Sequence, residues 1–222
     1  MFDRQLRRAA SPALEGIGHL LAGIGVRPGF VTGAGFLFGA GACVAAAERA
    51  WPAALALWLA NRVSDGLDGP VARARGPKEL GGFLDIVSDF AVYGGFVMGV
   101  AIGVPSARLA CIFLLLAYYV SGTAFLALSS LLERCQASQE ARDERSLRFV
   151  GGLAEGAETI VVYVLFCLLP SSAAVIAWSF AGAVTITALQ RVALGAKLLH
   201  RPPRSAQAAA SKPLPRQREV VA

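Results

Sequence analysis

Four carboxylates lie within a strongly apolar stretch of this chain: Asp65, Asp68, Asp85 and Asp89. An ionised side chain at the centre of a bilayer costs about 3 kcal/mol on insertion scales, so four so close together indicate a shared task. Carboxylates repel one another, and a cluster of them needs cations to be stable. Divalent ions that prefer oxygen ligands, such as Mg²⁺ or Mn²⁺, meet that need.

The spacing of these carboxylates places them in pairs. Asp65 and Asp68 stand at positions i and i+3, and Asp85 and Asp89 at i and i+4, so each pair shares one face of a helix. If residues 74–80 form a turn, two antiparallel helices bring both pairs to one site. Arg73 follows the first pair and offers a forked set of donors to a phosphate.

These residues resemble the signature of the CDP-alcohol phosphatidyltransferases: Asp-x-x-Asp-Gly-x-x-Ala-Arg, a spacer, then Gly-x-x-x-Asp-x-x-x-Asp. The spacer, residues 74–80, is one residue shorter here than in the family, which affects the turn and not the chemical residues. The matching positions are Asp65, Asp68, Gly69, Ala72, Arg73, Gly81, Asp85 and Asp89.

The resemblance implies a reaction and a role for each residue. The family transfers a phosphatidyl or related phospho-group from a CDP-alcohol to a second alcohol and releases CMP. Two Mg²⁺ or Mn²⁺ ions would be held by the four aspartates, with Asp89 also the general base and Arg73 the ligand of the diphosphate. The residues expected to bind substrate are Gly69, Ala72, Arg73, Gly81 and Thr32.

Thr32 is matched less closely than the others. It stands where the family has Pro-Asn-x-x-Thr, but Gly29 replaces the Asn. Thr32 is therefore either a nucleotide-side hydroxyl or a capping and packing residue.

Composition independently indicates an all-α integral membrane protein. The 222 residues are 55% hydrophobic and only 16% charged, with a mean hydropathy of +0.57. A soluble domain would have about 25% charged residues. We expect six transmembrane helices, at approximately 29–47, 51–72, 82–103, 109–131, 155–170 and 172–194.

The basic residues predict the orientation of these spans. With six spans both termini share one side, and almost all Lys and Arg residues fall there; only Arg49 and Arg108 fall on the other. The positive-inside rule then places both termini and the Asp motif in the cytoplasm, as for a bacterial inner membrane protein. The net charge of +6 follows from this asymmetry and does not require nucleic-acid binding.

The chain divides into three regions. Residues 1–27 mix apolar and basic positions and predict an amphipathic helix on the membrane surface, with an unstructured tail as the alternative. Residues 28–200 form the membrane domain. Residues 201–222, rich in Pro, Ser and Gln, predict a disordered cytoplasmic tail.

Several points stay open at this level. CDP-diacylglycerol and a small hydrophilic alcohol are the preferred substrates, but a soluble CDP-alcohol with a lipid acceptor, or a non-catalytic membrane scaffold or cation-binding protein, also fits. Arg62 pairs with the acidic cluster or contacts a phosphate. Arg191 binds an acceptor phosphate or reaches the interface, and Glu155 and Glu158 contact the acceptor or pair with arginines. The resemblance also suggests a homodimer.

Overall fold

The computed structural model describes residues 2–76, 79–137 and 156–199, and the regular structure of these residues is helical. Two short 3₁₀ turns, η1 (Pro105–Ala107) and η3 (Pro170–Ser172), precede α5 and α7. The α-helices are α1 (Phe2–Gly23), α2 (Pro28–Ala47), α3 (Trp51–Arg75), α4 (Glu79–Gly103), α5 (Arg108–Ala137), α6 (Gly156–Leu168) and α7 (Ala173–Leu199).

Proline and glycine set the ends of several helices. Pro28 stands in the first turn of α2, where its missing N–H and fixed φ cost nothing. Gly76 ends α3 with φ of 90°, a conformation that a residue with a Cβ rarely adopts. The chain therefore turns between α3 and α4, as the spacing of the aspartates requires.

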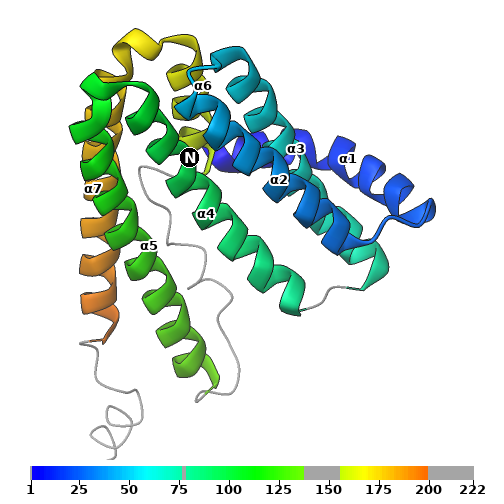
Figure 1. The fold of residues 1–222 in the computed structure, drawn as a ribbon. Helices are drawn as coiled ribbons and strands as arrows, with labels where there is room; N and C mark the ends of the chain where they lie inside the picture. Colours follow the sequence, from blue (N-terminus) through cyan, green and yellow to red (C-terminus); the bar gives the residue numbers. More distant parts are fainter. Residues whose placement is uncertain (1, 77–78, 138–155, 200–222) are drawn as a thin grey trace, which may run out of the picture.

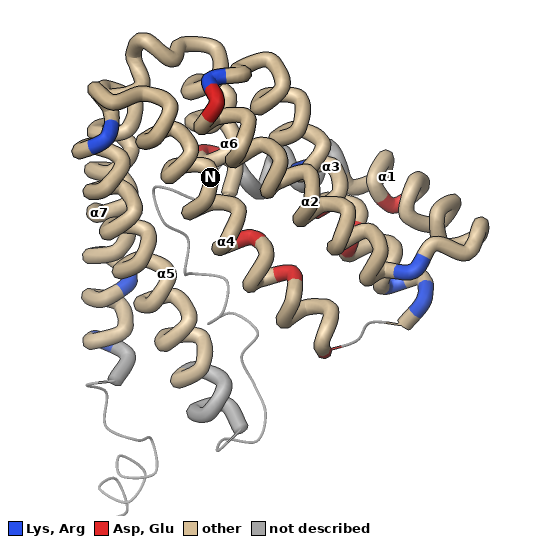
Figure 2. The backbone as a smooth tube through the Cα atoms, in the orientation of Figure 1, with Lys and Arg blue, Asp and Glu red and all other residues tan. Residues whose placement is uncertain are grey.

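Within the described residues, four segments are long and apolar enough to cross a membrane: Pro28–Ala47, Glu79–Gly103, Pro105–Leu131 and Pro170–Lys197. Figure 2 shows their long stretches without charged residues. The other two predicted spans are helical as well. However, α3 includes several charged residues, and α6 is only 13 residues long. That these two also cross the membrane stays a prediction.

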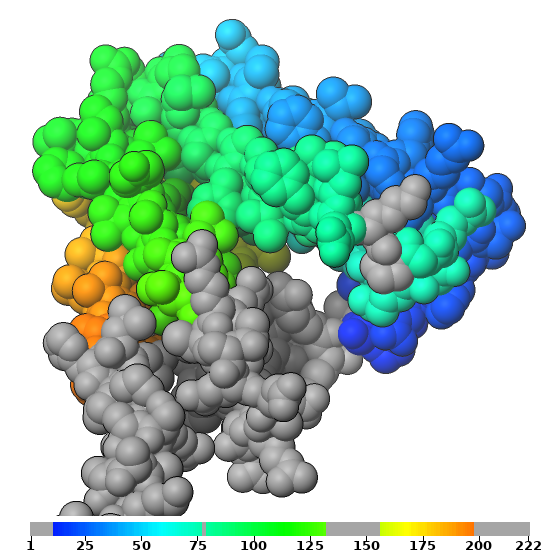
Figure 3. Space-filling view, turned by 90° about the horizontal axis from the view of Figure 1, so that it is seen from below, coloured from blue at the N-terminus to red at the C-terminus, as the bar shows by residue number. Residues whose placement is uncertain are grey.

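The helices pack in two groups joined by α4. α2 lies against α3 and α4, while α5 lies against α7. Figure 1 shows α5 and α7 side by side on one flank and α1, α2 and α3 on the other. Seen from below, α4 occupies the space between the two groups (Figure 3). The aspartates of α3 and α4 thus lie in the half of the protein that contains α2.

The core joins aromatic side chains from three helices. Trp58 of α3, Phe96 of α4 and Tyr163 of α6 are fully buried, and the rings of Phe96 and Tyr163 stack 4.6 Å apart. Small residues of α2 let the helices approach: a Cβ added at Gly39 would overlap Val92 of α4. Gly35 and Gly41 likewise face Ser64 and Leu57, so these glycines serve packing within the chain.

The N-terminal helix α1 packs on the signature half of α3. A Cβ added at Gly18 would overlap Pro70, and the side chain of Leu14 lies over Gly66. The guanidinium of Arg75 donates hydrogen bonds to the carbonyl oxygen of Ala22. The N-terminal segment is helical; that this helix is amphipathic and lies on a membrane surface stays a prediction.

Candidate functional site

The four aspartates line one small cavity between α2, α3 and α4. Asp65 and Asp68 come from α3, and Asp85 and Asp89 come from α4; we call these four residues the carboxylate cluster. The cavity has a volume of about 10 Å³, close to the space that one water molecule needs. Its remaining lining includes Thr32, Asn61 and Ser88.

The carboxylates differ in their surroundings. Asp68 is the most enclosed, with 9% of its surface exposed, and Thr32 of α2 donates a 2.6 Å hydrogen bond to its Oδ2 atom. The side chains of Asp65 and Asp89 are 33% and 29% exposed. Asp68 therefore holds its orientation through α2, and its burial makes its charge more costly without a cation.

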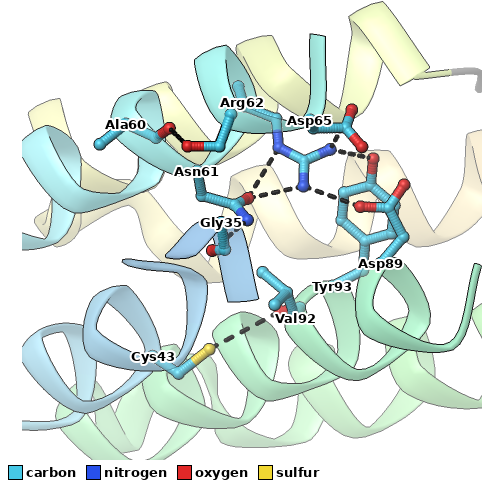
Figure 4. Close-up of polar contacts among 10 residues, drawn as sticks. Gly35, Cys43, Ala60, Asn61, Arg62, Asp65, Asp89, Val92 and Tyr93 are labelled. Carbon is cyan, nitrogen blue, oxygen red and sulfur yellow. Dashed lines mark hydrogen bonds and ion pairs between the residues drawn. The ribbon is translucent and has the colours of Figure 1, made fainter. Parts of the chain in front are cut away.

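Arg62 is the cation that the structure places in the cluster. Its Nη2 atom lies 2.9 Å from Oδ1 of Asp89, and its Nη1 atom lies 3.5 Å from Oδ2 of Asp65 (Figure 4). Of the two alternatives for Arg62, pairing with the acidic cluster is the one seen. It stands three residues before Asp65, so the helix brings both side chains to the same face.

The donor set fits a small, hard cation. Carboxylate and hydroxyl oxygens converge on one cavity from α2, α3 and α4, and these are the ligands that Mg²⁺ and Mn²⁺ prefer. As the side chains stand, no three acidic, His or Cys residues of the described ranges are close enough together to hold a metal ion. Side-chain rotation toward the cavity would be needed to complete such a site.

A much larger cavity adjoins the cluster. Its volume is about 840 Å³, and it shares Thr32, Asp68 and Asp85 with the smaller one. Three more of the residues predicted to bind substrate, Gly69, Ala72 and Gly81, line it. Its other lining residues are mainly apolar or small, among them Pro28, Phe30, Leu80, Gly82 and Leu84.

Arg73 does not line either cavity in this structure. Its side chain is 63% exposed, and its guanidinium lies beside Gly69 and 3.8 Å from the Oε1 atom of Glu15. Arg27 and Arg75 line the large cavity instead. From the sequence, these two arginines were assigned only to the basic side of the membrane. Their positions next to Pro28 and close to Arg73 could have marked them as residues of the site.

The remaining candidates lie away from the cluster or outside the description. Arg191 donates hydrogen bonds to the carbonyl and hydroxyl oxygens of Ser121 and lies over the ring of Phe125. Glu158 stands in the first turn of α6, and Glu155 lies outside the described residues. The structure thus joins the four aspartates with Thr32 and Arg62, and not with Arg191.

Comparison with known proteins bears on the family of the chain. The family model for CDP-alcohol phosphatidyltransferase matches residues 26–189. Inner membrane protein YnjF of Escherichia coli (strain K12) is 37% identical over 193 residues, which make up 86% of this chain and 94% of that relative.

Two solved structures of phosphatidylinositol phosphate synthase (PgsA1) from Mycobacterium tuberculosis share the fold. Each has a TM-score of 0.63 and 22% identity over 82% of this chain. One has CDP-DAG bound, and the match covers 92% of its chain. The other is in complex with manganese and citrate, and the match covers 88% of its chain. Together with the family match and the identity to YnjF, this shows that the chain belongs to the CDP-alcohol phosphatidyltransferase family.

Proposed function

We propose that this protein transfers a phosphatidyl group from CDP-diacylglycerol to a small hydrophilic alcohol and releases CMP. The observation that carries the proposal is the pair of adjoining cavities. One is small and lined by four carboxylates, the other is large and mainly apolar, and the two share Thr32, Asp68 and Asp85. A diphosphate with a nucleoside on one side and a lipid on the other matches that arrangement.

The carboxylate cluster would hold two divalent ions, Mg²⁺ or Mn²⁺, with Asp65, Asp68 and Asp85 as the principal ligands. Such ions supply charge neutralisation for the diphosphate and the attacking oxygen. The manganese in one structure of the mycobacterial relative supports this choice of ion.

The chain's own residues would hold the substrates and move a proton. Asp89 accepts the proton of the acceptor hydroxyl as its oxygen attacks the phosphorus of the phosphatidyl group. A new P–O bond forms, the P–O bond to the CMP phosphate breaks, and CMP leaves with the electron pair. Arg73 holds the diphosphate, which requires its exposed side chain to turn from Glu15 toward the large cavity.

The membrane has a role in this reaction. The proposal places six helices across a bacterial inner membrane, with α1 on the cytoplasmic surface and the cluster facing the cytoplasm. The lipid tails of the donor then stay in the bilayer while its headgroup enters the large cavity. The apolar helices and the inner membrane relative support this location.

The test is CMP release by the purified protein in detergent, with CDP-diacylglycerol, Mg²⁺ or Mn²⁺, and one acceptor at a time. Glycerol 3-phosphate, inositol phosphate, inositol and serine form the panel. CMP that appears with a single acceptor supports the proposal and identifies the product. A soluble CDP-alcohol that reacts with a lipid acceptor instead would reverse the assignment of donor and acceptor. The absence of CMP under all of these conditions would contradict the proposal.

A further inference from the structure

The guanidinium of Arg62 is held on all of its nitrogens. Nε and Nη2 both donate to Oδ1 of Asn61, at 2.8 and 2.6 Å, and Nη1 donates to the hydroxyl oxygen of Tyr93 at 2.6 Å. The remaining contacts are those to Asp65 and Asp89. Figure 4 shows the guanidinium between these side chains.

Two aromatic rings lie close to the same group. Its central carbon lies 4.6 Å from the ring centre of Trp58 and 4.9 Å from that of Tyr93, and the side chain is only 7% exposed. A planar, forked cation satisfies such surroundings, whereas a lysine ammonium would not make these parallel hydrogen bonds. Arg62 is therefore a fixed part of the site.

The same contacts connect the cluster to three helices. Asn61, which is 4% exposed, accepts from Arg62 through its oxygen and donates through its nitrogen to the carbonyl oxygen of Gly35 in α2. Tyr93 and Asp89 come from α4, and Arg62 itself from α3. The position of the Asp89 carboxylate is thus set by a chain of hydrogen bonds that reaches α2.

We propose that Arg62 is a positioning residue for Asp89, the general base of the function proposed above, on which this inference rests. Arg62 fixes one carboxylate oxygen of Asp89, Oδ1, so that the other can accept the proton of the acceptor alcohol. It also offsets one negative charge of the cluster, which keeps the carboxylates together before divalent ions bind.

Two substitutions separate these effects. In Arg62→Gln, kcat for CMP release falls about 100-fold because the base is misplaced, while KM for CDP-diacylglycerol stays within about twofold. Mn²⁺ binds about tenfold more tightly to this variant in calorimetric titration, because a positive charge beside the cluster has gone. In Arg62→Lys the charge remains and the fork is lost, so kcat stays low while Mn²⁺ affinity is that of the wild type.

Two more conservative substitutions, one test and one control, keep the inference testable if Arg62→Gln fails to fold. Tyr93→Phe keeps the ring and removes only the hydroxyl that accepts from Nη1; it lowers kcat about tenfold and leaves the Kd for Mn²⁺ unchanged. Tyr118→Phe is the matched control, because its hydroxyl pairs with Tyr163 in the core and not with Arg62. It leaves both quantities unchanged.

Three results would overturn the inference: wild-type kcat in Arg62→Lys, wild-type kcat in Tyr93→Phe, or weaker Mn²⁺ binding in Arg62→Gln. A merely structural role would lower turnover and Mn²⁺ affinity together. If the wild type releases no CMP with any acceptor, the proposed function fails. The order of Mn²⁺ affinities, with Arg62→Gln tightest and Arg62→Lys equal to the wild type, then tests only the second effect, that Arg62 offsets one negative charge of the cluster.

Discussion

Replacement of Asp68 by Asn changes the charge of the cluster with little change of shape. Asp68 is 9% exposed and accepts a 2.6 Å hydrogen bond from Thr32, which the amide oxygen of Asn can also accept. We therefore expect Asp68→Asn to fold. Compared with the wild type, the variant should be more stable without Mn²⁺ and less stable with Mn²⁺.

The magnitudes follow from Coulomb's law. Two unit charges 4 Å apart interact by about 4 kcal/mol at an effective dielectric constant of about 20. Mn²⁺ carries two charges, so the loss of one carboxylate from its site should weaken Mn²⁺ binding by at least about a factor of 1,000, since 1.4 kcal/mol corresponds to a factor of ten. Without metal, the variant loses repulsion from Asp65, which shares its helical face. A gain of about 1 kcal/mol raises Tm by about 2–4 °C in a protein of this size.

The assay is thermal unfolding in detergent with EDTA or with Mn²⁺, together with calorimetric titration of Mn²⁺. In EDTA the Asp68→Asn variant should unfold at a higher temperature than the wild type, whereas Mn²⁺ should raise the Tm of the wild type and not that of Asp68→Asn. Glu48→Gln, which removes an exposed carboxylate just beyond the other end of α2, is the control and should behave as the wild type. Mn²⁺ affinity within tenfold of the wild type in Asp68→Asn would refute the assignment of the metal site.

Other parts of the structure give three more expected outcomes. Gly99→Ala should lower the free energy of unfolding by about 1–3 kcal/mol, because the new Cβ overlaps the backbone carbonyl of Cys43 in α2. Gly182→Ala, in open space on α7, is the control and should not destabilise the protein. Denaturant titration measures both. Ala72→Leu fills part of the large cavity and should raise KM for CDP-diacylglycerol about tenfold without a change in Mn²⁺ affinity, whereas Ala53→Leu at the exposed start of α3 should not. EDTA should abolish CMP release, and excess Mn²⁺ should restore it; activity that persists in EDTA would contradict the metal requirement.

The sequence was sufficient to predict the centre of the site. The i, i+3 and i, i+4 spacings of the aspartates depend only on helical geometry, and a short turn between helices leaves few other arrangements. The four aspartates accordingly line one cavity. Thr32 lines it too, but it was a candidate only through the family resemblance. The helical elements followed in the same way from apolar runs interrupted by Pro28 and Pro170.

Other features depend on packing that spacing does not describe. The orientation of Arg73 toward Glu15 depends on how α1 lies on α3, and the N-terminal segment could be read as a helix or as a tail. The place of Arg62 depends on Trp58 and Tyr93, which read in the sequence as ordinary core residues. Six spans were predicted, but only four of the described helical segments are long and apolar enough to cross a membrane. The other two fall short because α3 is charged and α6 is short.

The central claim is that the carboxylate cluster performs the transfer, with Asp89 as its base, and Asp89→Asn tests it most directly. We measure CMP release by this variant beside the wild type, together with binding of Mn²⁺ and CDP-diacylglycerol. The account predicts that CMP release is abolished while CDP-diacylglycerol still binds with largely unchanged affinity. Mn²⁺, held mainly by Asp65, Asp68 and Asp85, should lose much less affinity than it does in Asp68→Asn. Normal turnover in Asp89→Asn would contradict it.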